Sequence, residues 1–211
     1  MKLDTALYFI TDSTGFEKDE FLRRIRSALE GGVTIIQLRE KNRTTREYID
    51  LAKAVHAITK EFNVPLIIDD RIDVMLAADC EGVHVGAEDM PVAVARKLIG
   101  KDKILGATAK TVEAAFKAFN DGADYLGVGA IYPTTTKVKT VLTSTETLDA
   151  ITKAVPIPVN AIGGLNASNL GVLKGIDIAG VCAVSAIMKA ESPKKAAEDL
   201  KQAFEDLRRN S

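Results

Sequence analysis

The sequence contains no tryptophan, and among its 211 residues only two are cysteines and two are histidines. Aromatic residues make up 5% of the chain, which argues against a protein that stacks nucleic-acid bases on aromatic side chains. Cys80 and Cys182 lie far apart in apolar segments, which predicts buried free thiols rather than a disulfide or a metal-binding pair. His84 has no second histidine in a strand-like segment to pair with, and this argues against a histidine-rich transition-metal site.

Neither sign of charge dominates, because 28 basic residues face 29 acidic ones. This balance argues against a general nucleic-acid or membrane-surface binder, although a local basic cluster remains compatible with it. No apolar run reaches 18 residues, and no charged segment followed by an apolar one opens the chain, which predicts a cytoplasmic protein. The chain also lacks G-x-S-x-G and a plausible Ser–His–Asp set, so acyl transfer has little support.

What the chain does contain is a series of short β-branched segments that alternate with segments of helical spacing. Such alternation predicts parallel βα units, and strands without a polar face are expected when helices cover the sheet. The predicted helices include Phe21 to Leu29, Arg46 to Phe62, Val112 to Phe119 and Ala196 to Leu207. The predicted strands lie within residues 6–12, 34–40, 65–70, 82–86, 103–109, 125–131, 157–164 and 180–186.

Eight such units favour a closed (β/α)8 TIM barrel, forming one catalytic domain over residues 1–211, rather than an open doubly wound sheet. The absence of G-x-G-x-x-G after the first strand weakens the dinucleotide-binding alternative. In a barrel the active site lies at the carboxyl ends of the strands. The residues that end each predicted strand are therefore the candidates for the active site.

The second predicted strand ends in "QLREK". Strand alternation places Gln37, Arg39 and Lys41 on one side, with Leu38 and Glu40 on the other. Charges on the inner face of an apolar strand are costly unless they meet a ligand or a partner charge. This pattern predicts either a binding site for an anionic ligand or a structural salt bridge to a carboxylate of a neighbouring strand.

Carboxylates end the third and fourth predicted strands. Asp69 and Asp70 close "IIDD", and Glu88 and Asp89 follow "GVHVG". Two carboxylates with room for water and phosphate oxygens suit Mg²⁺. The alternative is that Asp70 and Asp89 each cap the helical segment that follows.

The stretch "YPTTTK", residues 132–137, follows the sixth predicted strand. One threonine would suffice for a helix cap, and the next helical segment begins only around Ser144. We therefore predict that Thr134, Thr135 and Thr136 contact a phosphate or a heterocycle. Lys137 would supply a point charge to phosphate oxygens.

Glycines follow the seventh predicted strand in "AIGGLNAS", and the eighth ends in "VSAI". Gly163 and Gly164 precede a helix expected to start near Ala167, so backbone N–H groups and the helix dipole could bind an anion. Barrels frequently bind phosphate in these loops. Alternatively, the glycines serve only to form a turn.

Together, "QLREK", "IIDDRIDVMLAADCEGVHVGAEDMP", "LGVGAIYPTTTK", "AIGGL" and "VSAI" resemble thiamine phosphate synthase, in that family's order and over nearly the whole chain. The resemblance implies a (β/α)8 barrel and a transferase of thiamine biosynthesis. Enzymes of that family use Mg²⁺ to join 4-amino-2-methyl-5-hydroxymethylpyrimidine diphosphate to 4-methyl-5-(2-phosphooxyethyl)thiazole, and they release diphosphate. Diphosphate would leave the pyrimidine methylene before the thiazole nitrogen attacks, so no protein nucleophile is required.

The resemblance also implies a role for individual residues. Arg39, Lys41 and Lys137 would be catalytic, and Asp70 and Asp89 would hold Mg²⁺. The pyrimidine diphosphate would meet Gln37, Arg39, Lys41, Asp69, Thr108 and Lys137, and Leu38 and Glu40 would also be substrate-binding. The thiazole phosphate would meet Thr134, Thr135, Thr136, Gly164, Val184 and Ser185.

The chain departs from the family pattern at several positions. Asp69 stands where the family usually has Asn, Thr108 replaces Ser, and Lys110 replaces His in many members. The segment after Lys137, "VKTVLTSTETL", also differs from the family's loop. The alternatives are a thiazole tautomerase, which shares parts of "REK", and a non-catalytic phospholigand-binding regulator. The expected partners are small-molecule substrates, with neither nucleic acid nor membrane, and a homo-oligomer is compatible with the sequence.

Overall fold

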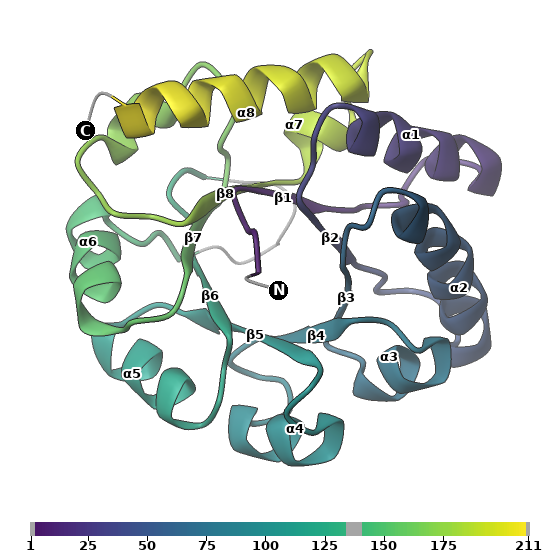
Figure 1. Ribbon diagram of the computed structural model, residues 1–211, viewed down its shortest axis with the longest axis horizontal. Coiled ribbons are helices and arrows are strands. Elements are labelled where there is room, and N and C mark those ends of the chain that lie inside the picture. Colours follow the sequence, from purple (N-terminus) through teal and green to yellow (C-terminus); the bar gives the residue numbers. More distant parts are fainter. Residues whose placement is uncertain (1–2, 134–140, 210–211) are drawn as a thin grey trace.

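A computed structural model of the chain describes residues 3–133 and 141–209. Its parallel strands close into a barrel in the order β1 to β8, each strand pairing with the next along the chain and β1 with β8 (Figure 1). The predicted (β/α)8 barrel is confirmed. The strands are β1 (Leu7–Ile10), β2 (Ile35–Leu38), β3 (Leu66–Asp69), β4 (Gly82–Val85), β5 (Ile104–Ala109), β6 (Tyr125–Gly129), β7 (Val159–Ile162) and β8 (Gly180–Ala183).

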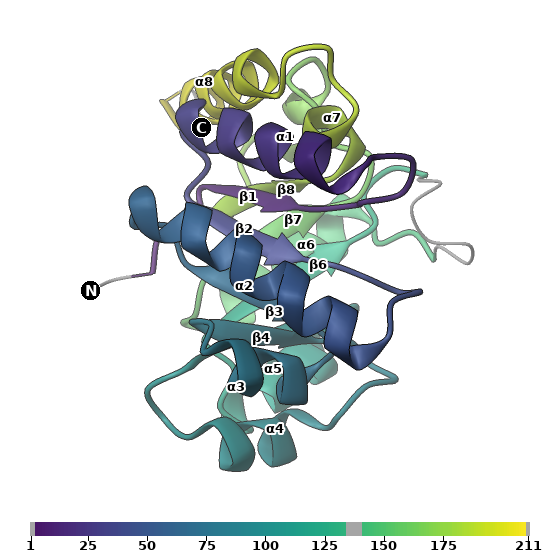
Figure 2. The same cartoon turned by 90° about the vertical axis from the view of Figure 1, so that its right-hand side faces the viewer.

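Helices surround the barrel and cover the outer face of its strands (Figures 1 and 2). Within the described part of the chain, no helix is long and apolar enough to cross a membrane. The α-helices are α1 (Lys18–Glu30), α2 (Thr45–Glu61), α3 (Ile72–Ala78), α4 (Val92–Ile99), α5 (Val112–Asn120), α6 (Thr145–Ala154), α7 (Ser185–Met188) and α8 (Pro193–Arg209).

Hydroxyl caps begin several of these helices. Thr44 forms a capping box with Glu47 at the start of α2, and Thr111 and Ser144 accept backbone N–H groups at the start of α5 and α6. The prediction of a helix that starts near Ala167 is wrong. Only a short 3₁₀ helix, η1 (Leu170–Leu173), occurs in that region, so a full α-helix dipole does not support the glycine loop.

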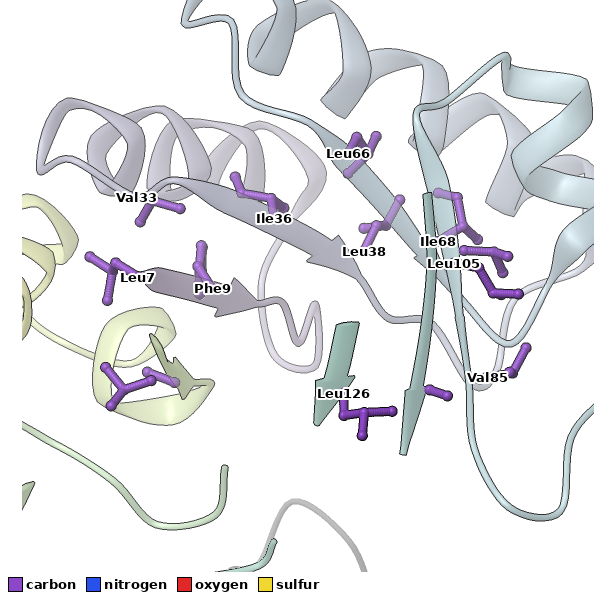
Figure 3. Close-up of a cluster of buried hydrophobic side chains, with 14 of the residues drawn as sticks. Leu7, Phe9, Val33, Ile36, Leu38, Leu66, Ile68, Val85, Leu105 and Leu126 are labelled. Carbon is purple, nitrogen blue, oxygen red and sulfur yellow. The ribbon is translucent and has the colours of Figure 1, made fainter. Parts of the chain in front are cut away.

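Strand alternation divides the buried side chains into two sets. The larger apolar cluster lies between the strands and the helices, and Figure 3 shows part of it on successive strands, including Leu7, Ile36 and Leu66. A smaller cluster, which includes Tyr8 and Tyr125, fills the inside of the barrel. Because the helices bury the outer set, the inner positions near the carboxyl ends are free to carry polar groups.

Candidate active site

A cavity of about 400 Å³ opens among residues at the carboxyl ends of the strands, and we call it the site cavity. Its lining brings together residues from all the strands of the barrel, β1 to β8, and from several of the loops that follow them. The predicted site residues in its lining are Gln37, Arg39, Asp69, Thr108, Gly164, Val184 and Ser185.

Other predicted residues lie elsewhere. The Leu38 side chain is buried in the outer apolar cluster, and Glu40 binds Ser13 and Arg43, so neither side chain lines the site cavity. The predicted contacts of Thr134, Thr135, Thr136 and Lys137 fall outside the described residues and stay predictions from the sequence.

Charged side chains from β2 and β3 meet at the rim of the site cavity. Lys41 Nζ lies 2.8 Å from Asp69 Oδ2 and also pairs with Asp70, while Arg39 Nε lies 3.8 Å from Asp69 Oδ2. Burial lowers the pKa of Lys41, but its contacts with Asp69 and Asp70 outweigh that effect and raise the pKa overall. The salt bridge expected under the structural alternative is therefore present, and it holds the cations beside the cavity.

Asp70 and Asp89 face each other from the ends of β3 and β4. The pKa of Asp89 is raised, chiefly by burial and then by the Asp70 carboxyl group. The Gly86 N–H donates to Asp89 Oδ2 at 2.8 Å, and the Asp70 N–H donates to the carbonyl oxygen of His84 at 2.8 Å. Asp70 has a left-handed backbone, with φ of 60°, a conformation that functional sites often impose on a non-glycine residue.

Helix capping does not explain these two aspartates. The residue that caps α3 is Arg71 and the one that caps α4 is Pro91, and neither helix has a side-chain cap bond at its start. The capping alternative is therefore wrong for both Asp70 and Asp89. Among the residues that the structure describes, no group of three or more His, Cys, Asp or Glu side chains could hold a metal ion without other ligands.

A chain of buried polar side chains crosses the floor of the site cavity, and we call it the floor chain. Gln37 Nε2 donates to the Tyr8 hydroxyl at 2.8 Å, and the hydroxyls of Tyr8 and Tyr125 lie 2.6 Å apart. Tyr125 Oη lies 3.2 Å from His84 Nδ1, and His84 Nε2 lies 3.0 Å from Thr108 Oγ1. Burial lowers the pKa of His84 to about 4, so its ring is neutral near pH 7.

Sequence reasoning did not assign Tyr8, His84 or Tyr125 to the site. Strand alternation could have placed each of them inside the barrel, because Tyr8 and Ile10 share one face of β1, as do His84 and Gly82 in β4. The contacts among these side chains form only when the barrel closes. The alternation within a single strand does not predict them.

Replacing Gly106 by alanine is expected to destabilise the protein by about 1 to 3 kcal/mol. A Cβ at this position would overlap the phenol of Tyr125 and Nδ1 of His84. Urea unfolding measures the effect, with Gly171→Ala as the matched control, because a Cβ there meets nothing within 4 Å. Equal stability of the two variants would contradict this packing of the floor chain.

The opposite side of the site cavity is built from backbone. Gly163 and Gly164 have φ of 107° and 66°, and a Cβ on Gly163 would overlap Ala130. The glycines are therefore required by the turn, and both also line the cavity beside Ser185, the first residue of α7. This side offers a hydroxyl and close backbone rather than charge.

Comparisons with known proteins give a consistent result. A family model for thiamine monophosphate synthase matches residues 7–187. The chain is 47% identical over 204 residues to a thiamine-phosphate synthase of Clostridium tetani, covering 97% of this chain and 98% of the relative. It is 52% identical over 185 residues to thiamine-phosphate synthase 2 of Streptococcus pneumoniae, covering 88% of each. The solved thiamine phosphate pyrophosphorylase of Pyrococcus furiosus superposes with a TM-score of 0.88 at 39% identity, covering 98% of both chains.

Proposed function

Because the chain belongs to the thiamine monophosphate synthase family, we propose that its site cavity holds the two substrates of that reaction and that Asp70 and Asp89 bind Mg²⁺ beside it. The chain is an enzyme that condenses the pyrimidine diphosphate with the thiazole phosphate to give thiamine phosphate and diphosphate. Relatives at 47% and 52% identity that carry the synthase name favour this reaction over the tautomerase and the regulator.

One observation supports this placement most strongly: the two sides of the site cavity differ in chemistry. Arg39 and Lys41 gather beside Asp69 at one side, and the turn of Gly163 and Gly164 forms the other. A diphosphate carries more negative charge than a phosphate monoester, so the cationic side suits the pyrimidine diphosphate. The glycine turn and Ser185 then suit the phosphate of the thiazole, as barrel loops after strands 7 and 8 often do.

The donors at Asp70 and Asp89 fit Mg²⁺. Both are carboxylates, they lie close enough that Asp70 raises the pKa of Asp89, and proteins commonly bind this ion through one or two carboxylates completed by water and phosphate oxygens. Mg²⁺ bound there would neutralise part of the negative charge of the diphosphate.

The reaction itself exchanges one bond for another at the pyrimidine methylene. The C–O bond breaks and its electron pair leaves with the diphosphate, and the lone pair of the thiazole nitrogen then forms the new C–N bond. Arg39 and Lys41 stabilise the charge on the leaving diphosphate, and the site cavity orients the thiazole nitrogen towards the methylene. Lys137 would add a further cation, a role that stays a prediction from the sequence.

The proposed reaction is tested by incubating the purified protein with both substrates and Mg²⁺ and measuring diphosphate release and thiamine phosphate. Both products are expected in equal amounts, and neither should form when the thiazole phosphate is left out. Tautomerisation of a thiazole without diphosphate release, or binding of either substrate without turnover, would contradict it.

Ser185→Ala is expected to raise the KM for the thiazole phosphate by roughly 5- to 30-fold, equivalent to the loss of about 1 to 2 kcal/mol. The effect is partial because the backbone of Gly163 and Gly164 remains. Steady-state kinetics with the pyrimidine diphosphate saturating give this KM. An unchanged value would remove Ser185 from the thiazole phosphate site.

A further inference from the structure

The floor chain has a direction, which follows from the donors and acceptors that its members possess. Gln37 Nε2 can only donate, so the Tyr8 oxygen accepts from it. Tyr8 has one proton of its own, and within the described residues its remaining hydrogen-bond partner is the Tyr125 hydroxyl. The Tyr8 O–H therefore donates to Tyr125, because Tyr8 is buried with 1% of its surface exposed and no other acceptor for its proton lies among its hydrogen-bond partners in the described residues.

The donors and acceptors beyond Tyr8 follow the same direction. With its oxygen accepting from Tyr8, Tyr125 uses its own proton for His84 Nδ1, which must then be unprotonated. In a neutral imidazole the other nitrogen carries the proton, so His84 Nε2–H donates to Thr108 Oγ1. The Thr108 hydroxyl accepts that bond and keeps its own proton for a partner in the site cavity, which it lines.

Other protonation patterns leave a buried group without a partner. An imidazolium, or a ring protonated at Nδ1, would donate to Tyr125, and one tyrosine proton would then have no acceptor in the chain. Reversing every bond at once would require Gln37 to turn its amide oxygen towards Tyr8, the opposite of its orientation in the structure. A single direction therefore satisfies all five side chains as they stand.

We propose that Tyr8, Tyr125 and His84 are positioning residues that hold the Thr108 hydroxyl as a hydrogen-bond donor into the site cavity. The matching substrate group is an acceptor with an in-plane lone pair, such as a ring nitrogen of the pyrimidine, rather than a ring N–H. The identity of that acceptor rests on the proposed function, whereas the direction of the floor chain does not. Gln37 on β2 and Thr108 on β5 are thereby linked through residues that need not touch the substrate.

The direction is tested by nitrogen-15 NMR of the full chain at neutral pH, without substrate. The chain has two histidines, so a His56→Gln variant assigns the His84 signals. We expect a protonated Nε2 and an unprotonated Nδ1 for His84. A proton on Nδ1, or on both nitrogens, would overturn the proposal. The NMR result does not depend on whether the protein makes thiamine phosphate. The direction of the floor chain and the proposed function can therefore be disproved separately.

Kinetics test whether the positioning acts through Thr108. Thr108→Val is expected to lower kcat/KM for the pyrimidine diphosphate roughly fivefold or more, and Tyr125→Phe by a similar factor. The double variant should lose little more than either single one, because both changes remove the same oriented donor. Thr108→Ser keeps a hydroxyl and should recover most of the activity that Thr108→Val loses.

Two outcomes would overturn the proposal, one in the kinetics and one in the NMR spectrum of the Tyr125→Phe variant. The first is losses that multiply in the double variant, since they would show that Tyr125 acts independently of Thr108. The second is an unchanged His84 spectrum in Tyr125→Phe, because that tyrosine would then not set the tautomer. Thermal melting of each variant confirms that it is folded before its spectrum or its rate is interpreted.

Discussion

Replacing Asp89 by asparagine is expected to lower turnover by about 100-fold or more and, at the same time, to raise the melting temperature of the metal-free protein. The loss of activity follows from the proposed Mg²⁺ site, because one of its two carboxylates is gone. The gain in stability follows from the raised pKa of Asp89, which burial and Asp70 together produce. Asparagine keeps an oxygen for the Gly86 N–H and removes the unfavourable charge.

The sign of the stability effect sets its pH dependence. A carboxyl group whose pKa is raised by folding stabilises the protein below its unfolded pKa, here 3.8, and that contribution is lost as pH rises through the folded pKa. The melting temperatures of Asp89→Asn and the unsubstituted protein should therefore converge near pH 3 to 4 and separate as pH rises to neutrality. Differential scanning calorimetry in a chelating buffer measures this difference.

Asp73→Asn serves as the control with the opposite sign, because Arg71 lowers the pKa of Asp73. That variant should lose a little stability near neutral pH and keep its activity. Added Mg²⁺ should raise the melting temperature of the unsubstituted protein and of Asp73→Asn but not of Asp89→Asn. A metal-dependent rise of equal size in all three proteins would show that Asp89 does not bind the ion.

Lys41→Met is expected to lower kcat by about 100-fold, with a smaller effect on either KM. Methionine keeps much of the side-chain length but removes the ammonium group that pairs with Asp69 and Asp70. If that group stabilises charge gained as diphosphate leaves, its loss appears in kcat rather than in KM. Single-turnover measurements with both substrates saturating isolate this chemical step.

The matched control is Lys103→Met. Lys103 also makes an ion pair of 2.8 Å, with Asp79, but it precedes β5 at the opposite end of the barrel. The Lys103→Met substitution should leave kcat unchanged. A chemical step that slows less than about threefold in Lys41→Met would assign Lys41 a purely structural salt bridge.

The Lys41→Met variant also tests how much the ion pairs of Lys41 contribute to the stability of the folded protein. Contacts with Asp69 and Asp70 raise the pKa of Lys41 above 10.5, so the ion pairs stabilise the folded protein below that pH and lose their effect as pH rises through the raised value. The gap in unfolding free energy between the unsubstituted protein and Lys41→Met should be constant from pH 7 to 9 and close above about pH 10.5.

Much of this arrangement could be predicted from periodicity. Alternation within "QLREK" placed Gln37 and Arg39 on one face, and both line the site cavity. The neighbouring carboxylates were expected beside them because successive βα units of a barrel are adjacent, and Lys41 indeed contacts Asp69 and Asp70. These predictions needed only local spacing and the order of the strands.

The floor chain could not be predicted in this way. Tyr8 and Tyr125 are separated by 117 residues and lie on strands that are not neighbours, so their contact depends on how far each side chain reaches across the barrel. The missing helix near Ala167 has a different cause. Its asparagine side chains bond to nearby backbone, as Asn166 does to the Ser168 N–H and Asn169 to the Asn166 N–H, and such local bonds compete with helix formation.

The packing of Gly106 against Tyr125 has a consequence for how such a protein can change over generations. The glycine leaves the room that the tyrosine ring occupies, so a larger side chain on β5 is tolerable only when β6 gives up its aromatic ring. Gaining a methyl group at one position and losing a ring at the other would each be harmful alone, the first through overlap and the second through an empty space and a broken hydrogen-bond chain. The two positions are thus expected to change as a pair during evolution, and a designer who wishes to reshape the floor of the site cavity would have to alter both strands in one step.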